Sequence, residues 1–347
     1  LPCQVPVPRV RALPAVLAVA LTAGALAPVA AQPAQAVETT TPRMQVVAPL
    51  YESPGGTVPV LVTVHQPPRG AAVTLSATAD GGASVTCTAL TWTNPVRRST
   101  TRKCYLTTPR RAGTYRITGT ARLTAPDRPA LVVSGTRTIQ ADGVPTAPIS
   151  LAAAQAIERC HRTTTRVRLT FDDAFQSSAD FTSIRATLKR NRVRATFFGV
   201  RGWATATQAA ALLADGHDVQ NHTREHLALS RVSDTEVRRQ IAGGAQPSRT
   251  PKLLRPPYGA GALTTRLHDL AAAQGYRLCR WTADTSDWNN TSPAVMVEKI
   301  RYGDATTPPL RAGGNLLMHM GGEQTPEALP RVIDAIRAKG LVLDPLP

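Results

Sequence analysis

The sequence predicts an α/β fold, a distorted (β/α) barrel over residues 151–347, preceded by an all-β immunoglobulin-like sandwich over residues 45–140. Two observations predict this division. Short β-branched segments separated by Gly, Pro and Asp fill the first stretch. Strand-like and helix-like segments alternate in the second, which is typical of a parallel sheet. The 347 residues, 42% of them hydrophobic, are enough for two domains with cores of their own.

The first 36 residues have the order of a secretory signal peptide. Arg9 and Arg11 precede an uncharged apolar stretch over residues 12–31, and small-residue sites follow at Val29-Ala30-Ala31 and Ala34-Gln35-Ala36. The stretch is long enough to be a membrane anchor instead, but its prolines and the A-x-A site favour cleavage. We therefore expect a secreted or cell-wall-associated protein, with no stable membrane span after the signal is removed.

A linker over residues 37–44 is expected to lead into the β domain, and a second over residues 141–150 to follow it. Seven strands in about a hundred residues are typical of an immunoglobulin-like sandwich. The predicted strands cover residues 45–50, 58–65, 72–77, 84–92, 103–107, 114–123 and 131–139.

The formal net charge of +17 favours anionic partners. No nucleic-acid-binding motif accompanies it, so we expect no nucleic acid partner. A basic cluster in the β domain could contact an anionic cell-wall polymer, although the notable alternative, a set of solvated loops, is the simpler explanation. The cluster consists of Arg97, Arg98, Arg102, Lys103, Arg110 and Arg111.

Cysteine usage fits an exported chain. Cys3 precedes the apolar stretch, and four cysteines follow it. The simplest pairing is one disulfide per domain, Cys87 with Cys104 and Cys160 with Cys279. Four cysteines allow three connectivities, so the pairing is a hypothesis. If Cys87 and Cys104 pair, they join neighbouring strands.

Strand and helix patterns alternate from residue 151 onward, so a parallel sheet is expected, either open or closed as a barrel. Ser233 and Glu236 form the pattern of a capping box. The predicted strands cover residues 167–171, 194–198, 218–221, 276–281 and 315–319. The predicted helices cover residues 182–189, 207–213, 236–241, 264–273, 294–300 and 326–339.

Polar motifs stand at the ends of two predicted strands, where barrels place their active sites. Asp172 and Asp173 follow an apolar strand, and neighbouring strand residues point to opposite faces, so one can hold a cation while the other acts as a base. Adjacent aspartates also mark ordinary turns. His222 and His226, at i and i+4, can share one face of a helical turn and bind one metal, although this spacing alone is usually coincidental.

Three further motifs complete the set. Arg255-Pro256-Pro257-Tyr258-Gly259 is a rigid loop that fixes its Arg and Tyr. A segment from Trp281 to Trp288 contains Asp284 and Asp287, and an apolar strand ends at His319. Each motif alone is compatible with an ordinary turn or a buried core residue.

Together and in this order, the five motifs resemble the polysaccharide deacetylases of carbohydrate esterase family 4. The resemblance runs from about Arg166 to the C-terminus, and Ala195-Thr196-Phe197-Phe198-Gly199 also resembles that family's second strand. It implies that Asp173, His222 and His226 bind one divalent metal ion, zinc or a similar ion.

The resemblance also implies roles for the other motif residues. Asp172 resembles the catalytic base, Arg255 the arginine that orients it, and His319 the general acid. Tyr258 stands where the family stabilises the oxyanion with a backbone N–H group. The remaining matches are Asp287 and Trp288 as the acid and the aromatic wall beside the catalytic His, Leu317 as the lining of the acetyl pocket, and Asp284 as the less certain carboxylate of its segment.

The implied activity is removal of N-acetyl groups from N-acetylglucosamine polymers, either chitin oligomers or peptidoglycan. An O-acetyl esterase acting on acetylated xylan, or a non-catalytic wall-binding protein, are the alternatives. One departure is plain: Ala174 and Phe175 stand where the family usually has Gly-Pro. This bulk beside the base bears on groove shape and substrate range more than on the chemistry.

Overall fold

The computed structural model describes residues 41–49, 51–202, 205–248 and 251–347. The predicted signal peptide and residues 37–40 of the first linker lie outside these residues. Residues 40–347 form one compact unit. None of the described helices is both long enough and apolar enough to cross a membrane.

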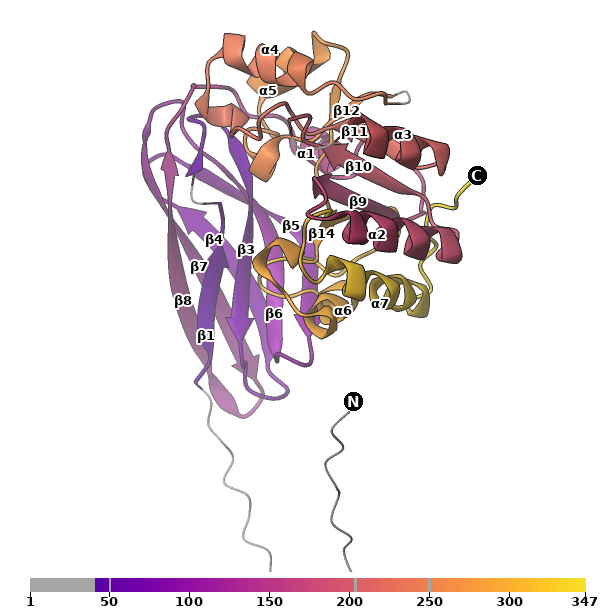
Figure 1. The fold of residues 1–347 in the computed structure, drawn as a ribbon. Coiled ribbons are helices and arrows are strands. Elements are labelled where there is room, and N and C mark those ends of the chain that lie inside the picture. Colours follow the sequence, from indigo (N-terminus) through magenta and orange to yellow (C-terminus); the bar gives the residue numbers. More distant parts are fainter. Residues whose placement is uncertain (1–40, 50, 203–204, 249–250) are drawn as a thin grey trace, which may run out of the picture. The chain divides into compact units, whose positions relative to one another are not determined.

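Residues 43–141, here called the β region, form two sheets (Figure 1), in the orders β1-β3-β6-β5 and β2-β8-β7-β4. Neighbouring strands are antiparallel except β2 and β8, which pair in parallel. The strands are β1 (Arg43–Val47), β2 (Tyr51–Glu52), β3 (Thr57–His65), β4 (Ala72–Ala79), β5 (Ser84–Asn94), β6 (Ser99–Thr107), β7 (Gly113–Ala125) and β8 (Arg128–Ala141).

Alternation of side chains builds the core of the β region. In β7, Tyr115, Ile117, Ala121 and Leu123 point inward and are buried, while the side chains that alternate with them are exposed or half-buried. They share one hydrophobic cluster with residues of β3, including Val60. All seven predicted strands are present, and only the two-residue β2 was missed. The immunoglobulin-like assignment stays a prediction.

Residues 151–347, here called the α/β region, contain a parallel sheet in the order β13-β12-β11-β10-β9-β15-β14. No pairing joins β13 to β14 among the described residues, so the predicted barrel is an open, curled half-barrel. The strands are β9 (Arg168–Asp173), β10 (Ala195–Gly199), β11 (Asp218–Asn221), β12 (Leu253–Leu254), β13 (Arg277–Leu278), β14 (Ala283–Asp284) and β15 (Asn315–His319).

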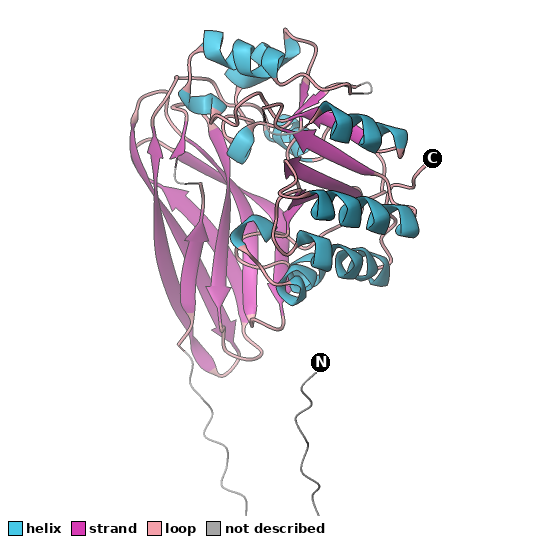
Figure 2. Cartoon of the chain, viewed as in Figure 1, coloured by secondary structure: helices cyan, strands magenta, loops and turns pink. Residues whose placement is uncertain are grey.

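Helices occur only in the α/β region among the residues described (Figure 2). All six predicted helices are present, and α1, whose N-cap is Ser150, was missed. They are α1 (Leu151–Glu158), α2 (Ser178–Asn191), α3 (Ala206–Ala214), α4 (Asp234–Gly243), α5 (Thr265–Ala272), α6 (Pro293–Tyr302) and α7 (Thr325–Ala338).

The capping-box prediction is only half right. Ser233 caps α4, because its side chain accepts a hydrogen bond from the backbone N–H of Glu236. The Glu236 carboxylate does not reach back, since it accepts hydrogen bonds from Arg239 and Gln240 instead. A reciprocal capping box forms at α3, between Thr205 and Gln208.

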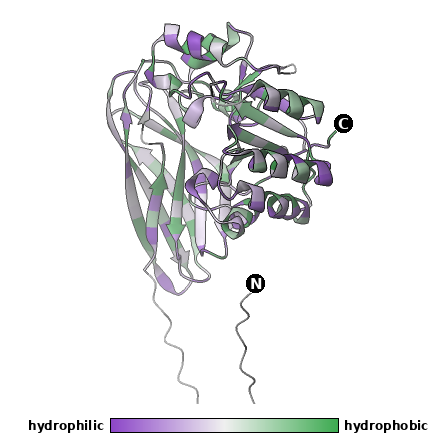
Figure 3. Cartoon of the chain, viewed as in Figure 1, coloured by the Kyte–Doolittle hydropathy of each residue, from purple (hydrophilic) through white to green (hydrophobic). Residues whose placement is uncertain are grey.

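The parallel sheet is buried on both faces, which suits its continuous apolar strands. All five residues of β10 are buried, and the rings of Phe171 and Phe197 stack with centroids 5.0 Å apart. Residues of α7, such as Leu329 and Ile333, belong to the same core. Figure 3 shows hydrophobic residues along these strands and more polar residues on helices such as α4.

Both predicted disulfides are formed, Cys87–Cys104 and Cys160–Cys279. Cys87 and Cys104 are opposite residues of the neighbouring strands β5 and β6, as expected.

A buried ion pair connects the β region to the α/β region. Lys103 Nζ lies 2.6 Å from Glu158 Oε2, and the Tyr105 hydroxyl donates to the same oxygen at 3.0 Å. Lys103 is only 7% exposed. The prediction that Lys103 belongs to a surface cluster that could contact an anionic polymer was therefore wrong, because Lys103 forms a buried ion pair with Glu158.

Candidate active site

The candidate site lies at the carboxyl ends of neighbouring strands. β9 lies between β10 and β15, so Asp172 is directly opposite His319, and Asp173 opposite Gly199. β11 pairs with β10 on the far side and ends at Asn221, just before His222. The parallel register therefore brings together the Asp-Asp pair, the two histidines and His319.

Three ligand atoms converge on one point. Oδ1 of Asp173 lies 3.2 Å from Nε2 of His226 and 3.4 Å from Nε2 of His222. This oxygen is buried and has no hydrogen-bond donor. Burial alone would raise the pKa of Asp173, but the two facing imidazoles hold it well below its ordinary value.

This donor set fits a metal ion. The three ligand atoms lie within 4.8 Å of one another. The Nδ1–H group of His222 can donate to the carbonyl oxygen of Arg255 at 2.7 Å, which leaves Nε2 for the metal. One carboxylate and two imidazoles are ligands typical of a catalytic zinc site with open positions.

The two histidines do not share a helical turn, which corrects the prediction. Thr223 and His226 both have positive φ, 72° and 62°, so the segment folds as a loop. Asn221 stabilises it, because its Oδ1 accepts from the backbone N–H of Thr223 and its Nδ2 donates to the carbonyl oxygen of Ile241. Sequence reasoning gave Asn221 no role.

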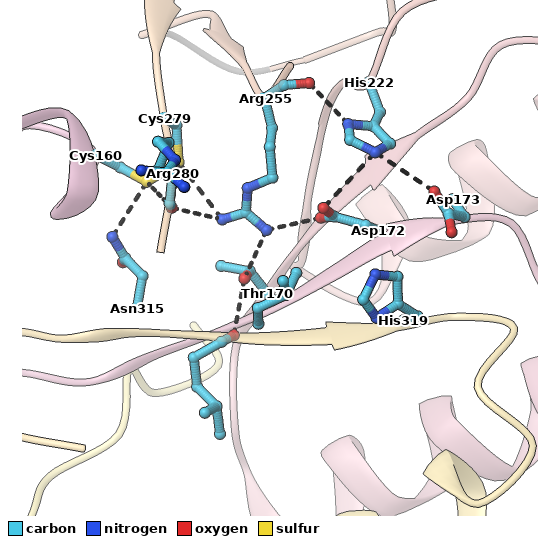
Figure 4. A network of polar contacts seen from close by, with 12 residues as sticks. Cys160, Thr170, Asp172, Asp173, His222, Arg255, Cys279, Arg280, Asn315 and His319 are labelled. Atoms are coloured by element: carbon cyan, nitrogen blue, oxygen red, sulfur yellow. Dashed lines mark hydrogen bonds and ion pairs between the residues drawn. A yellow bond between two sulfur atoms is a disulfide. The ribbon is translucent and has the colours of Figure 1, made fainter. Parts of the chain in front are cut away.

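Asp172 lies against a fully buried arginine (Figure 4). Nη1 of Arg255 donates to Asp172 Oδ1 at 2.7 Å and to the hydroxyl of Thr170 at 2.9 Å, while Nη2 donates to the carbonyl oxygen of Arg280. Oδ2 of Asp172 lies 3.7 Å from His222 Nε2. The arginine therefore fixes one carboxylate oxygen and leaves the other facing the metal ligands.

His319 is paired with Asp287. Their Nδ1 and Oδ1 atoms are 2.8 Å apart, and the second oxygen of Asp287 accepts from the backbone N–H of His319 and from the hydroxyl of Thr325. Burial would lower the pKa of His319, but the hydrogen bond and charge of Asp287 outweigh it and raise the pKa to about 9. Thr325 was missed, because its position at the start of α7 carries no sequence signal.

The other predicted residues have different exposures. Tyr258 has φ 60° and is 70% exposed, with its ring 4.7 Å from that of His226. Trp288 is 62% exposed, whereas Leu317 is buried in β15. Burial raises the pKa of Asp284 to about 6. The hydrogen bond that Asp284 accepts from the backbone N–H of Ser286 lowers the pKa, but by less than burial raises it.

A groove of about 530 Å³ opens over the site, lined by residues that include Asp173, His319 and Trp288. Phe175 also lines it, but its ring packs 5.0 Å from that of Phe181 and 6.1 Å from that of Phe197. The Phe175 side chain, which stands where the family usually has Pro, therefore packs partly into the core. It still forms part of one wall of the groove.

The chain resembles proteins of known family. A family model described as polysaccharide deacetylase matches residues 161–279. A chitooligosaccharide deacetylase of Sinorhizobium fredii is 30% identical over 206 residues, which cover 52% of this chain and 90% of that protein.

A peptidoglycan-N-acetylglucosamine deacetylase of Listeria monocytogenes is 32% identical over 187 residues, but the match covers only 37% of its length and 52% of this chain. Among solved structures, a family 4 carbohydrate esterase from Streptomyces lividans in complex with acetate has 30% identity and a TM-score of 0.46, over 52% of this chain and 91% of that one. By the family model and the match to the Sinorhizobium fredii enzyme, the chain belongs to the polysaccharide deacetylase family.

Proposed function

We propose that the protein is an exported, metal-dependent hydrolase that removes N-acetyl groups from polysaccharides containing N-acetylglucosamine, either peptidoglycan or chitin oligomers. The observation that carries the proposal is the position of Asp172 directly opposite His319 on the neighbouring strand, beside three convergent metal-ligand atoms. These two residues would serve as the base and the charged acid. The names of the related enzymes, which include both substrates, support it.

Asp173, His222 and His226 would hold the metal, and a bound divalent ion such as zinc supplies Lewis acidity toward the acetyl carbonyl and toward water. The tautomer of His222 is set by its hydrogen bond to Arg255, so the ligand nitrogen needs no rearrangement. Asp173 is in its ionised, ligand form because the two imidazoles keep its pKa low.

Asp172 is the base that takes a proton from the attacking water. Arg255 donates to Oδ1 of Asp172, so Oδ2 faces the metal-ligand candidate His222. This orientation favours proton transfer at Oδ2. A second carboxylate so close to Asp173 would be costly without the arginine, since two buried like charges repel.

His319 is the acid that protonates the departing sugar amine. Asp287 keeps it charged at neutral pH and fixes its ring, so the proton is available on Nε2. The backbone N–H group of Tyr258 is assigned to the oxyanion, Trp288 to a wall of the sugar site and Leu317 to the acetyl pocket. Asp284, which contacts the backbone of Ser286, supports the loop that carries Asp287.

The test is acetate release by the mature protein from N-acetylglucosamine oligomers, peptidoglycan and acetylated xylan. We expect release from one of the first two with zinc present, and none from Asp172→Asn. Release from xylan alone would make the protein an O-acetyl esterase. No release from any of the three by zinc-loaded protein would reject the proposal and favour a binding role.

A further inference from the structure

A second cavity, of about 330 Å³, lies where the β region meets the loops of the α/β region. Glu52 of β2 and Thr57 of β3 line one side of it, and Ala228, Tyr258 and Arg280 line the other. The cavity is therefore built by both regions and would not exist in either one alone.

Arg280 brings an unpaired charge to this cavity. The residue is 7% exposed, and its Nε atom is buried without a hydrogen-bond partner. Among the residues described, the guanidinium has no ion-pair partner and lies over the ring of Trp281, with Cζ 4.8 Å from the ring centroid. Burying a guanidinium without hydrogen-bond acceptors is costly, so an external polar group is its natural complement.

Gly259 is adapted to this arrangement. It has φ +66°, and a Cβ atom there would come within 2.9 Å of Nε and Nη2 of Arg280. Only glycine lets the loop that carries Tyr258 approach the guanidinium so closely.

Glu52 faces the same cavity. It is 5% exposed, and the backbone N–H of Ser53 donates to its Oε1 at 2.7 Å. Burial raises the pKa of Glu52 to about 7, although the hydrogen bond from Ser53 and the charge of Arg280 oppose this. At neutral pH this carboxyl group can therefore donate as well as accept a hydrogen bond.

Tyr258 joins the cavity to the candidate active site. Tyr258 is 70% exposed and lines the cavity, and its ring packs 4.7 Å from the ring of the metal-ligand candidate His226. An exposed aromatic ring beside a donor and an acceptor is a suitable surface for a sugar, which has an apolar face and a rim of hydroxyl groups.

We propose that this cavity binds a second sugar of the substrate chain, away from the one that loses its acetyl group, so that the β region takes part in substrate recognition. The proposal rests on the proposed function. A neutral, hydroxyl-rich ligand fits better than an anion, because an anion that satisfied Arg280 would also face Glu52.

The test is calorimetric binding of the disaccharide and the pentasaccharide of N-acetylglucosamine to zinc-loaded Asp172→Asn protein, which does not turn over. Adding Glu52→Ala should weaken pentasaccharide binding about tenfold, as expected for the loss of one hydrogen bond, and leave disaccharide binding unchanged. Arg280→Met should weaken pentasaccharide binding in the same direction.

Glu298→Ala is the matched control, because Glu298 contacts Asn94 and Arg97 of the β region but does not line the cavity. An equal loss in this control would mean that Glu52 acts only by holding the two regions together, and would overturn the proposal. Unchanged pentasaccharide binding in Glu52→Ala, or equal loss for both sugars, would also overturn it. The binding assay needs no turnover. It therefore still tests the second sugar site if the protein proves not to release acetate.

Discussion

At the scale of single residues, the candidate site separates two carboxylates that are neighbours in sequence. Asp172 is held by the buried guanidinium of Arg255, whereas Asp173 faces two imidazoles and has a buried oxygen with no donor. Their different surroundings fit the roles proposed for them, proton transfer for Asp172 and metal binding for Asp173. The Asp-Asp pair predicted two roles, but only the position of Arg255 shows how they are kept apart.

The charge of His319 depends on Asp287, which predicts a pH dependence. The pKa of His319 is raised to about 9, so the acid stays protonated at neutral pH and loses its proton as the pH rises through about 9. Asp287→Asn should move the alkaline limb of kcat/KM to lower pH and reduce the rate at neutral pH. The measurement is a pH profile of acetate release.

Glu327→Gln is the control for that profile. Glu327 is an exposed carboxylate that pairs with Arg331 and contacts neither Asp287 nor His319. Its alkaline limb should stay where the unmodified protein has it. An unshifted limb in Asp287→Asn would show that His319 is not the group that titrates.

At the scale of elements, the sequence predicted the long and strongly patterned pieces well. β11 and β15 have the predicted bounds, and all six predicted helices exist. The missed strands β12 and β14 have two residues each, too few for a periodic pattern. The H-x-x-x-H spacing suggested a helical turn, but the Asn221 side chain accepts from the backbone N–H of Thr223 and donates to the carbonyl oxygen of Ile241. The contact with Ile241 is long-range, and the spacing of the histidines cannot reveal it.

The residues that sequence reasoning missed act through contacts that only folding creates. Thr325 donates to Asp287 across a separation of 38 residues, and the carbonyl oxygen of Arg280 accepts from Arg255 across 25. Neither belongs to a motif. The chemical groups of the site were therefore predictable, while the residues that position them were not.

The two disulfides should contribute unequally to stability. Cys160 and Cys279 are separated by 119 residues, and Cys87 and Cys104 by 17. A longer closed loop removes more entropy from the unfolded chain, so replacing the first pair by alanines should lower the free energy of unfolding by about 1.7 kcal/mol more than replacing the second. Denaturant unfolding of both double variants measures this, and the reverse order would contradict it.

At the scale of the whole molecule, residues 40–347 form one compact unit, and a buried ion pair contributes to its internal interface. Lys103→Met leaves the Glu158 carboxylate buried without its cation, which should lower the free energy of unfolding by about 3–5 kcal/mol. The double variant Lys103→Met, Glu158→Leu should recover much of this loss.

Denaturant titrations of the single and double variants provide the measurement. Arg331→Ala is the control, because its ion pair with Glu327 is exposed and should contribute less than about 1 kcal/mol. A single Lys103 variant as stable as the unmodified protein would mean that the ion pair does not hold the two regions together.

If Asp173, His222 and His226 bind the metal on which acetate release depends, metal content and activity must be lost and recovered together. The most direct measurement is metal content and acetate release of one preparation, before chelation, after chelation and after zinc is restored. We predict one metal ion per chain, loss of activity with the metal and recovery with zinc, and neither metal nor activity in His226→Ala. Full activity in protein shown to be free of metal would mean that acetate release does not depend on a metal at these three residues.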